Sequence, residues 1–128
     1  MKLRFSASDE AFRVEVANWL RDNLCGEFES IRFRGGPGDE HSFVEERKAW
    51  ERKLGEAGWT CIGWPQAWGG RAASIEQQVV FNEEYARAGG PGRIGHIGET
   101  LMGPTLIAYG SEAQKAKYLP SIRSGDAI

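Results

Sequence analysis

Residues 74–90 read SIEQQVVFNEEYARAGG, and this stretch indicates the fold class of the whole chain. Ser74 followed three positions later by Gln77 is a capping-box pattern, in which each side chain hydrogen-bonds the backbone of the other residue at the start of a helix. Apolar residues then recur at helical spacing, and two glycines with the adjoining Pro91 stop the pattern. The stretch therefore predicts a broadly buried helix that ends near Ala88.

Four further segments carry helical signals, each with apolar residues three and four positions apart. We expect helices at about 8–24, 42–57, 97–109 and 111–119. Ser8 is expected to cap the earliest of them, while Ser42 and Ser111 each begin another capping-box pattern.

Two prolines modify this scheme. Pro104 lies within the segment 97–109 and is expected to kink it, because proline lacks the N–H that an α-helix uses. Pro120 is expected to begin a short additional helix that ends at Gly125. No segment before residue 126 alternates apolar and polar residues as a half-buried strand does. The predicted architecture is all-α, with about five helices.

The composition excludes several classes of function. The 128 residues suit a single domain, and 16 basic against 18 acidic residues give a net charge of -2. Such a balance provides no broad positive surface for nucleic acid or an anionic membrane. The sequence shows neither a signal-peptide pattern nor an apolar run long enough to span a membrane, so we expect a cytoplasmic protein without a membrane span.

Cysteine and histidine are too sparse to suggest a metal site or a disulfide framework. Cys25 and Cys61 lie far apart and lack CxxC spacing, and we expect both to be reduced thiols. His41 and His96 are separated widely and have no carboxylate or cysteine at ligand spacing. We therefore predict no bound metal.

The motifs that could carry chemistry have simpler explanations. Residues 90–95, GPGRIG, match GxGxxG, but they follow a helix and contain a proline, whereas a dinucleotide loop leaves a strand and opens a helix. A glycine-rich turn between helices is the favoured interpretation. Glu83 and Glu84 are adjacent, so a helix points them about 100° apart and they cannot share one proton. No GxSxG elbow is present. No catalytic residue is predicted.

A run of twelve uncharged residues stands out, WTCIGWPQAWGG at 59–70. Trp59, Trp64 and Trp68 are large aromatic residues in a Gly/Pro-rich turn, and they need apolar cover. Two interpretations remain open: the run caps the core of its own domain, or it docks on another domain or subunit. The three tryptophans are thus candidate interface residues.

The stretch CGEFESIRFRGGPGDEH, residues 25–41, is predicted to be a connection. It is rich in glycine and charge, both typical of loops. The region Gly35–Pro37 is the part that we expect to be mobile.

Three stretches together resemble a known family. They are GWTCIGWPQAWGG at 58–70, FNEEYARAG at 81–89 and GPTLIAYGSEAQKAKYLPSIRSGDAI at 103–128. In this order and spacing they are similar to the N-terminal helical domain of flavin-dependent acyl-CoA dehydrogenases, from about residue 8 to the end. We therefore expect residues 1–128 to form this one domain.

The resemblance implies the organisation of a larger enzyme. Members of this family have an N-terminal α-domain, a middle β-barrel and a C-terminal four-helix bundle, and they form dimers or tetramers. The chain resembles the first part only, so the β-barrel and bundle are expected to be absent from it. The intact enzyme would use FAD, an acyl-CoA substrate and an electron-transfer partner protein, with a catalytic glutamate outside these residues. The 128 residues alone are expected to be inactive.

The resemblance also suggests where substrate lies. In the family, the helix before the GP pair lines the distal end of the acyl pocket, which carries over to His96, Thr100 and Gly103, while Glu99 stays uncertain. The glycine-rich stretch 89–98 is interpreted as room for a bulky or long acyl tail, or as contact with a partner subunit.

Two alternatives stay open on the sequence. The chain could be a noncatalytic subunit of a heteromeric dehydrogenase, which would gain activity only with its partner. It could also be an unrelated helical protein-interaction module, for which the tryptophan run would be the docking surface.

Overall fold

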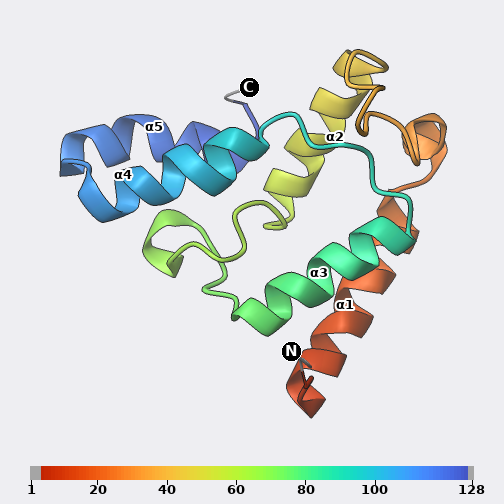
Figure 1. Ribbon diagram of the computed structural model, residues 1–128, viewed down its shortest axis with the longest axis horizontal. Coiled ribbons are helices and arrows are strands. Elements are labelled where there is room, and N and C mark those ends of the chain that lie inside the picture. The colour runs from red at the N-terminus through yellow and green to blue at the C-terminus, as the bar shows by residue number, and fades with distance from the viewer. Residues whose placement is uncertain (1–3, 127–128) are drawn as a thin grey trace. The chain divides into compact units, whose positions relative to one another are not determined.

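The computed structural model describes residues 4–126 (Figure 1). The described part is helical and contains no strand, which confirms the all-α prediction. Five α-helices are joined by two 3₁₀ segments and one π-helical segment. In chain order these are α1 (Ala7–Asn23), η1 (Gly26–Ile31), α2 (Val44–Glu56), η2 (Gln66–Trp68), α3 (Ile75–Arg87), η3 (Gly98–Met102), α4 (Gly103–Tyr109) and α5 (Glu112–Ser124). Among these helices, none has the length and apolar character needed to cross a bilayer.

The contacts divide the chain into two compact units. The first unit contains the residues up to Val44 together with Ala73–Gly92. The second contains Glu45–Ala72 and the residues from Arg93 onward.

In the first unit, α1 packs along α3 (Figure 1). Helix α1 buries one stripe of apolar residues at helical spacing, and α3 contributes buried residues of its own. The buried apolar side chains of these two helices are Phe12, Val16, Leu20, Val80 and Phe81.

The caps of these two helices test the sequence analysis directly. The Ser74–Gln77 capping box of α3 is present. Helix α1, however, is capped by Ser6, and the expectation for Ser8 was wrong. The Ser6 hydroxyl accepts from the Asp9 N–H at 3.1 Å, and the Asp9 carboxylate accepts from the Ser6 N–H at 2.9 Å. Ser8 has alanine three positions later, which cannot complete such a box.

The segment 25–41, which was predicted to be a connection, contains regular secondary structure. Its first part forms η1, where Phe28 and Ile31 are buried one 3₁₀ turn apart. The Asp39 carboxylate accepts hydrogen bonds from Arg34 Nε and from the Gly35 N–H, both at 2.9 Å. The mobility of Gly35–Pro37 stays a prediction.

In the second unit, α4 and α5 lie side by side (Figure 1). A small apolar cluster is formed by Cys61, Trp64 and Leu119, with partly buried residues packed on it. Trp50 and Leu54 of α2 are also fully buried. The expected Ser42 cap of α2 is wrong, because Phe43 would then be the first helical residue and its φ is +53°.

Pro104 and Pro120, both in the second unit, differ from expectation. Pro104 lies in the first turn of α4, directly after the π-helical segment η3, so the expected single helix is divided there. Pro120 lies inside α5 and does not begin a separate helix. The carbonyl that loses its helical donor there belongs to Ala116, which is exposed together with Pro120, so water can satisfy it. The Ser111–Gln114 capping box of α5 is confirmed.

Candidate functional site

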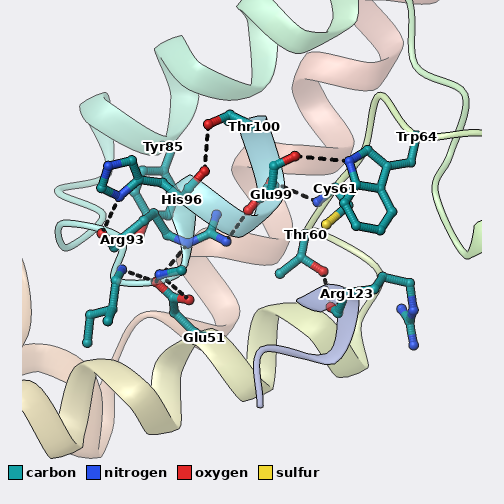
Figure 2. Close-up of polar contacts among 12 residues, drawn as sticks. Glu51, Thr60, Cys61, Trp64, Tyr85, Arg93, His96, Glu99, Thr100 and Arg123 are labelled. Carbon is teal, nitrogen blue, oxygen red and sulfur yellow. Dashed lines mark hydrogen bonds and ion pairs between the residues drawn. The ribbon is translucent and has the colours of Figure 1, made fainter. Parts of the chain in front are cut away.

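A buried carboxylate organises the candidate site in the second unit. Glu51 of α2 is 1% exposed, and its side chain accepts a hydrogen bond from Arg93 Nε at 3.1 Å. It also accepts from the backbone N–H groups of Ile94 and Gly95 (Figure 2). A carboxylate buried in this way is compensated by one charged donor and two backbone donors. Glu51 therefore fixes the turn that leads into the segment expected to bind substrate.

The same arginine connects Glu51 to a second carboxylate. Arg93 Nη2 donates to Glu99 Oε2 at 2.5 Å, and Glu99 Oε1 accepts from the backbone N–H of Cys61 at 2.7 Å. Both oxygens of Glu99 are thus engaged within the protein. Glu99, which the resemblance left uncertain, points toward Arg93 and the tryptophan run in Figure 2.

The helix at Glu99 has an unusual register. The N–H of Gly103 donates to the carbonyl of Gly98, five positions earlier, as in a π-helix. The Glu99 carbonyl instead accepts from the indole Nε1 of Trp64 at 3.0 Å. A side chain therefore supplies a hydrogen bond that backbone normally supplies.

The three predicted substrate-binding residues have different environments. His96 and Thr100 are exposed, and the Thr100 hydroxyl donates to the His96 carbonyl at 2.5 Å, so both belong to one helical face. Gly103 is buried against Trp64. Substrate contact by His96, Thr100 and Gly103 stays a prediction, and the packing of Gly103, the first residue of α4, against Trp64 is what the structure shows for it.

Three apolar residues beside His96 and Thr100 were not predicted as site residues. Ile97, Leu101 and Met102 are 61%, 65% and 54% exposed. Their spacing predicted a helix over 97–109 but did not indicate whether they would be buried or exposed. The sequence signal that could have indicated their exposure is Pro104, which disturbs helical hydrogen bonding two residues after Met102. We call these three exposed residues the apolar edge; Ile97 lies directly before η3, and Leu101 and Met102 lie within it.

The tryptophan run is mostly buried within its own unit. Trp59 and Trp64 are 3% and 5% exposed, while Trp68 is partly buried on the Cys61–Trp64–Leu119 cluster. The guanidinium of Arg71 lies over the Trp59 ring at 3.6 Å and donates to the Gly58 carbonyl at 2.7 Å. An interface role for the three tryptophans stays a prediction, and Trp68 is the one with partly accessible surface.

The glycines of the stretch 89–92 are packed rather than surrounded by free space. A Cβ at Gly90 would lie 2.3 Å from the Tyr85 ring, and one at Gly92 would lie 2.0 Å from the Gly35 carbonyl oxygen. At these two positions the absence of a side chain serves close packing in the first unit. Gly90 and Gly92 therefore leave no room for an acyl tail, while for the rest of the stretch 89–98 the interpretation as room for a tail or contact with a partner subunit stays a prediction.

The adjacent pair in α3 is divided between interior and surface. Glu84 is buried and binds Arg13 at 3.0 Å and Arg87 at 2.7 Å, while Glu83 is exposed and binds Arg13 at 3.2 Å. The hydrogen bond to Glu84 is the main cause that raises the pKa of Arg13. The pair stabilises the packing of α1 on α3.

The two cysteines differ in reactivity. Cys25 is exposed, and Cys61 is buried. Burial raises the pKa of the Cys61 thiol to about 12, and the neighbouring Glu99 carboxylate adds to the increase. Cys61 is therefore a packing residue rather than a nucleophile at neutral pH. Across residues 4–126, no three His, Cys, Asp or Glu side chains are close enough to hold a metal ion.

With this geometry in place, the comparison with known sequences identifies the class of protein. The chain matches the family of the acyl-CoA dehydrogenase N-terminal domain over residues 6–126. The match covers nearly the whole chain, which therefore belongs to this family.

Individual relatives show which members of the family the chain is similar to. Over 114 residues the chain is 53% identical to acyl-CoA dehydrogenase IpdE1 of Mycobacterium tuberculosis, which covers 89% of this chain and 30% of that protein. Among solved structures it is similar to the Tcur3481-Tcur3483 steroid ACAD, with a TM-score of 0.78 and 35% identity over 100% of this chain and 32% of that one. It is also similar to the ChsE4-ChsE5 complex from Mycobacterium tuberculosis, with a TM-score of 0.76 and 27% identity over 100% of this chain and 30% of that one.

The chain thus spans about a third of the length of the relatives that it matches.

Proposed function

We propose that this chain is the substrate-shaping N-terminal domain of an acyl-CoA dehydrogenase that oxidises bulky acyl-CoA thioesters. The observation that carries the proposal is the exposed apolar edge of Ile97, Leu101 and Met102 beside His96 and Thr100. An acyl tail is apolar and gains by leaving water, so an apolar edge on a fixed backbone is a suitable wall for it. The two polar residues at its side would orient the tail.

The chemistry itself is assigned to other parts of the intact enzyme. Dehydrogenation of a thioester requires a base that removes the α-proton, and donors that stabilise the negative charge on the thioester oxygen. Glu51 and Glu99 hold Arg93, and Glu84 holds Arg13 and Arg87. These three carboxylates are thus committed to structure. We assign none of them as the catalytic base.

FAD is proposed as the cofactor of the intact enzyme, where it would accept the β-hydride. In the described part of the chain, every buried side-chain nitrogen and oxygen has a hydrogen-bond partner. No orphaned donor therefore marks a flavin site in residues 4–126. We assign the flavin contacts chiefly to segments outside this chain.

A bulky substrate and an oligomeric enzyme are the finer parts of the proposal. The support for both lies in the relatives, of which one is described as a steroid ACAD and another as a complex of two proteins. We infer a CoA thioester of a steroid or long fatty acid, an assembly of two or four subunits, and a separate electron-transfer protein as acceptor. The free cysteines accord with the cytoplasm as the proposed location.

A domain exchange tests the proposal. Residues 6–126 replace the matching domain of IpdE1 from Mycobacterium tuberculosis, and the fusion is assayed for bound flavin and for acyl-CoA-dependent reduction of an acceptor dye. We expect flavin binding and turnover, with steroid or long acyl-CoA preferred over butyryl-CoA. The 128-residue chain alone should be colourless and inactive.

The control is unmodified IpdE1, prepared in the same way. A fusion that folds and binds flavin but oxidises no acyl-CoA, beside an active control, would contradict the proposal and favour a noncatalytic subunit. Stoichiometric flavin on the 128-residue chain would contradict the assignment of the flavin contacts to other segments.

A further inference from the structure

The π-helical segment η3 has a chemical cause in the residue that follows it. Because Gly103 donates to the Gly98 carbonyl, the same five-residue register assigns the Glu99 carbonyl to the N–H of residue 104. Residue 104 is proline and has no N–H. Gly103, the donor that an ordinary α-helix would use for Glu99, is already engaged. The Glu99 carbonyl is therefore left without a backbone donor.

The indole of Trp64 fills this position. Its Nε1 donates to the Glu99 carbonyl at 3.0 Å, and the side chain is buried, so water is a poor substitute (Figure 2). The indole can approach because residue 103 is glycine: a Cβ there would lie 2.1 Å from Trp64 Cζ2. Gly103 thus leaves space for the indole. Pro104 lacks the N–H that would otherwise donate to the Glu99 carbonyl.

The carboxylate of Glu99 holds the same turn from a second direction. It accepts from the Cys61 N–H at 2.7 Å and from Arg93 at 2.5 Å, and Arg93 is fixed in turn by Glu51. One residue of η3 is thus tied by its main chain and by its side chain to the run that contains Trp64. This double attachment defines where the wide turn lies.

We propose that Trp64 is a positioning residue that sets acyl specificity. It supplies the hydrogen-bond donor that Pro104 lacks, and this bond fixes the π turn beside which Ile97, Leu101 and Met102 are exposed. This inference rests on the proposed function, in which that apolar edge lines the acyl site. A π turn carries one residue more than an α turn, so its loss would rotate Leu101 and Met102, which lie within the turn, relative to Ile97, which precedes it. Trp64 acts through Glu99 and does not itself contact substrate.

Two substitutions and their combination test the hydrogen bond itself. Trp64→Phe removes the indole N–H and keeps an aromatic ring, while Pro104→Ala provides a backbone N–H that can reach the Glu99 carbonyl. Trp19→Phe is the matched control, because it removes an indole N–H from α1, in the other unit. Amide hydrogen exchange at residues 98–103 is measured on the 128-residue chain, and kcat and KM on the IpdE1 fusion with steroid acyl-CoA and butyryl-CoA.

We expect Trp64→Phe to speed exchange at Gly103 and to lower kcat/KM for the steroid thioester by about tenfold, mainly through KM, with butyryl-CoA changed less than about twofold. Adding Pro104→Ala should restore both, and Trp19→Phe should change neither. A purely structural role would lower kcat/KM for both substrates together. That result would overturn the proposal, and so would an unchanged ratio of kcat/KM between the steroid thioester and butyryl-CoA. A double variant that regains neither slow exchange nor the steroid kcat/KM would overturn it as well. A fusion that oxidises no acyl-CoA even without substitutions is a separate result, which overturns the proposed function and with it this role.

Discussion

Gly103, the first residue of α4, packs against Trp64 so closely that a Cβ at residue 103 would lie 2.1 Å from Trp64 Cζ2. The same Cβ would lie 2.9 Å from the Gly98 carbonyl oxygen. Neither neighbour is the free end of a flexible side chain, since one is a buried ring and the other is backbone. Any side chain at residue 103 therefore requires the π turn or the indole to move.

We expect Gly103→Ala to lower the free energy of unfolding by about 1–3 kcal/mol, because overpacking of a tight contact forces backbone and side-chain shifts. Urea unfolding followed by far-UV circular dichroism measures the change. Gly36→Ala is the control, because a Cβ there meets nothing within 4 Å, and it should alter stability by less than about 0.5 kcal/mol. Equal effects of the two substitutions would contradict the close contact.

Removal of the Glu51 carboxylate should be more severe. Glu51→Ala leaves two backbone N–H groups without their acceptor and Arg93 with one carboxylate fewer, and breaking a buried pair typically costs about 3–5 kcal/mol. Glu56→Ala on the same helix is the control, because Glu56 is exposed and should contribute less than about 0.5 kcal/mol. A Glu51 variant that unfolds at the wild-type urea concentration would show that the carboxylate is not needed.

The helices that the sequence predicted best are those specified by adjacent residues. The Ser74 and Ser111 capping boxes are complete within four residues, and both helices begin where expected. The error at the first helix has the same origin, since the partner three positions along, Asp9, selects Ser6 over Ser8. Local side chain to backbone chemistry is thus sufficient to place helix starts.

The geometry of the candidate site arises from contacts between residues distant in sequence, which a local sequence pattern cannot predict. The π turn arises because Pro104 lacks a donor and Trp64, distant in sequence, supplies one. Glu51 and Arg93 are likewise 42 positions apart. Periodicity predicted a helix at Leu101 but not the exposure of its side chain, which the structure shows. His96 and Thr100 were selected through the resemblance, because nothing in their own spacing distinguishes them.

Mutation of Glu84 and of Glu83, the acidic pair of α3, should lower the stability by clearly different amounts. Glu84→Gln weakens two ion pairs of a buried carboxylate, with Arg13 and Arg87, and we expect a loss of about 1–3 kcal/mol. Glu83→Gln weakens one exposed pair and should cost at most about 1 kcal/mol. Unfolding by urea at low and high salt measures both, and salt should diminish the Glu83 effect more. A larger loss at Glu83 would contradict the assigned interior and surface positions.

The turn after η1 should respond to acid through one carboxylate, Asp39. The Arg34 guanidinium, the Gly35 N–H and the Ser42 hydroxyl all donate to it, and together they hold the pKa of Asp39 well below its usual value of 3.8. In the unfolded chain these donors are lost. As the pH falls through 3.8, the unfolded state therefore binds the proton before the folded state does, and the stabilisation from Asp39 disappears toward the lower pKa of the folded state.

Asp39→Asn should accordingly be less stable than the wild type above pH 3.8, and its stability should decline less steeply below that pH. Urea unfolding across this range measures the slope, and amide exchange at Gly35 reports whether the Gly35–Pro37 region gains the expected mobility. Arg34→Gln is the matched variant: it retains the carboxylate but removes its strongest donor, so the pKa should rise toward 3.8 and the acid slope should again flatten. If Arg34→Gln kept the full wild-type slope, the guanidinium could not be what lowers the pKa of Asp39.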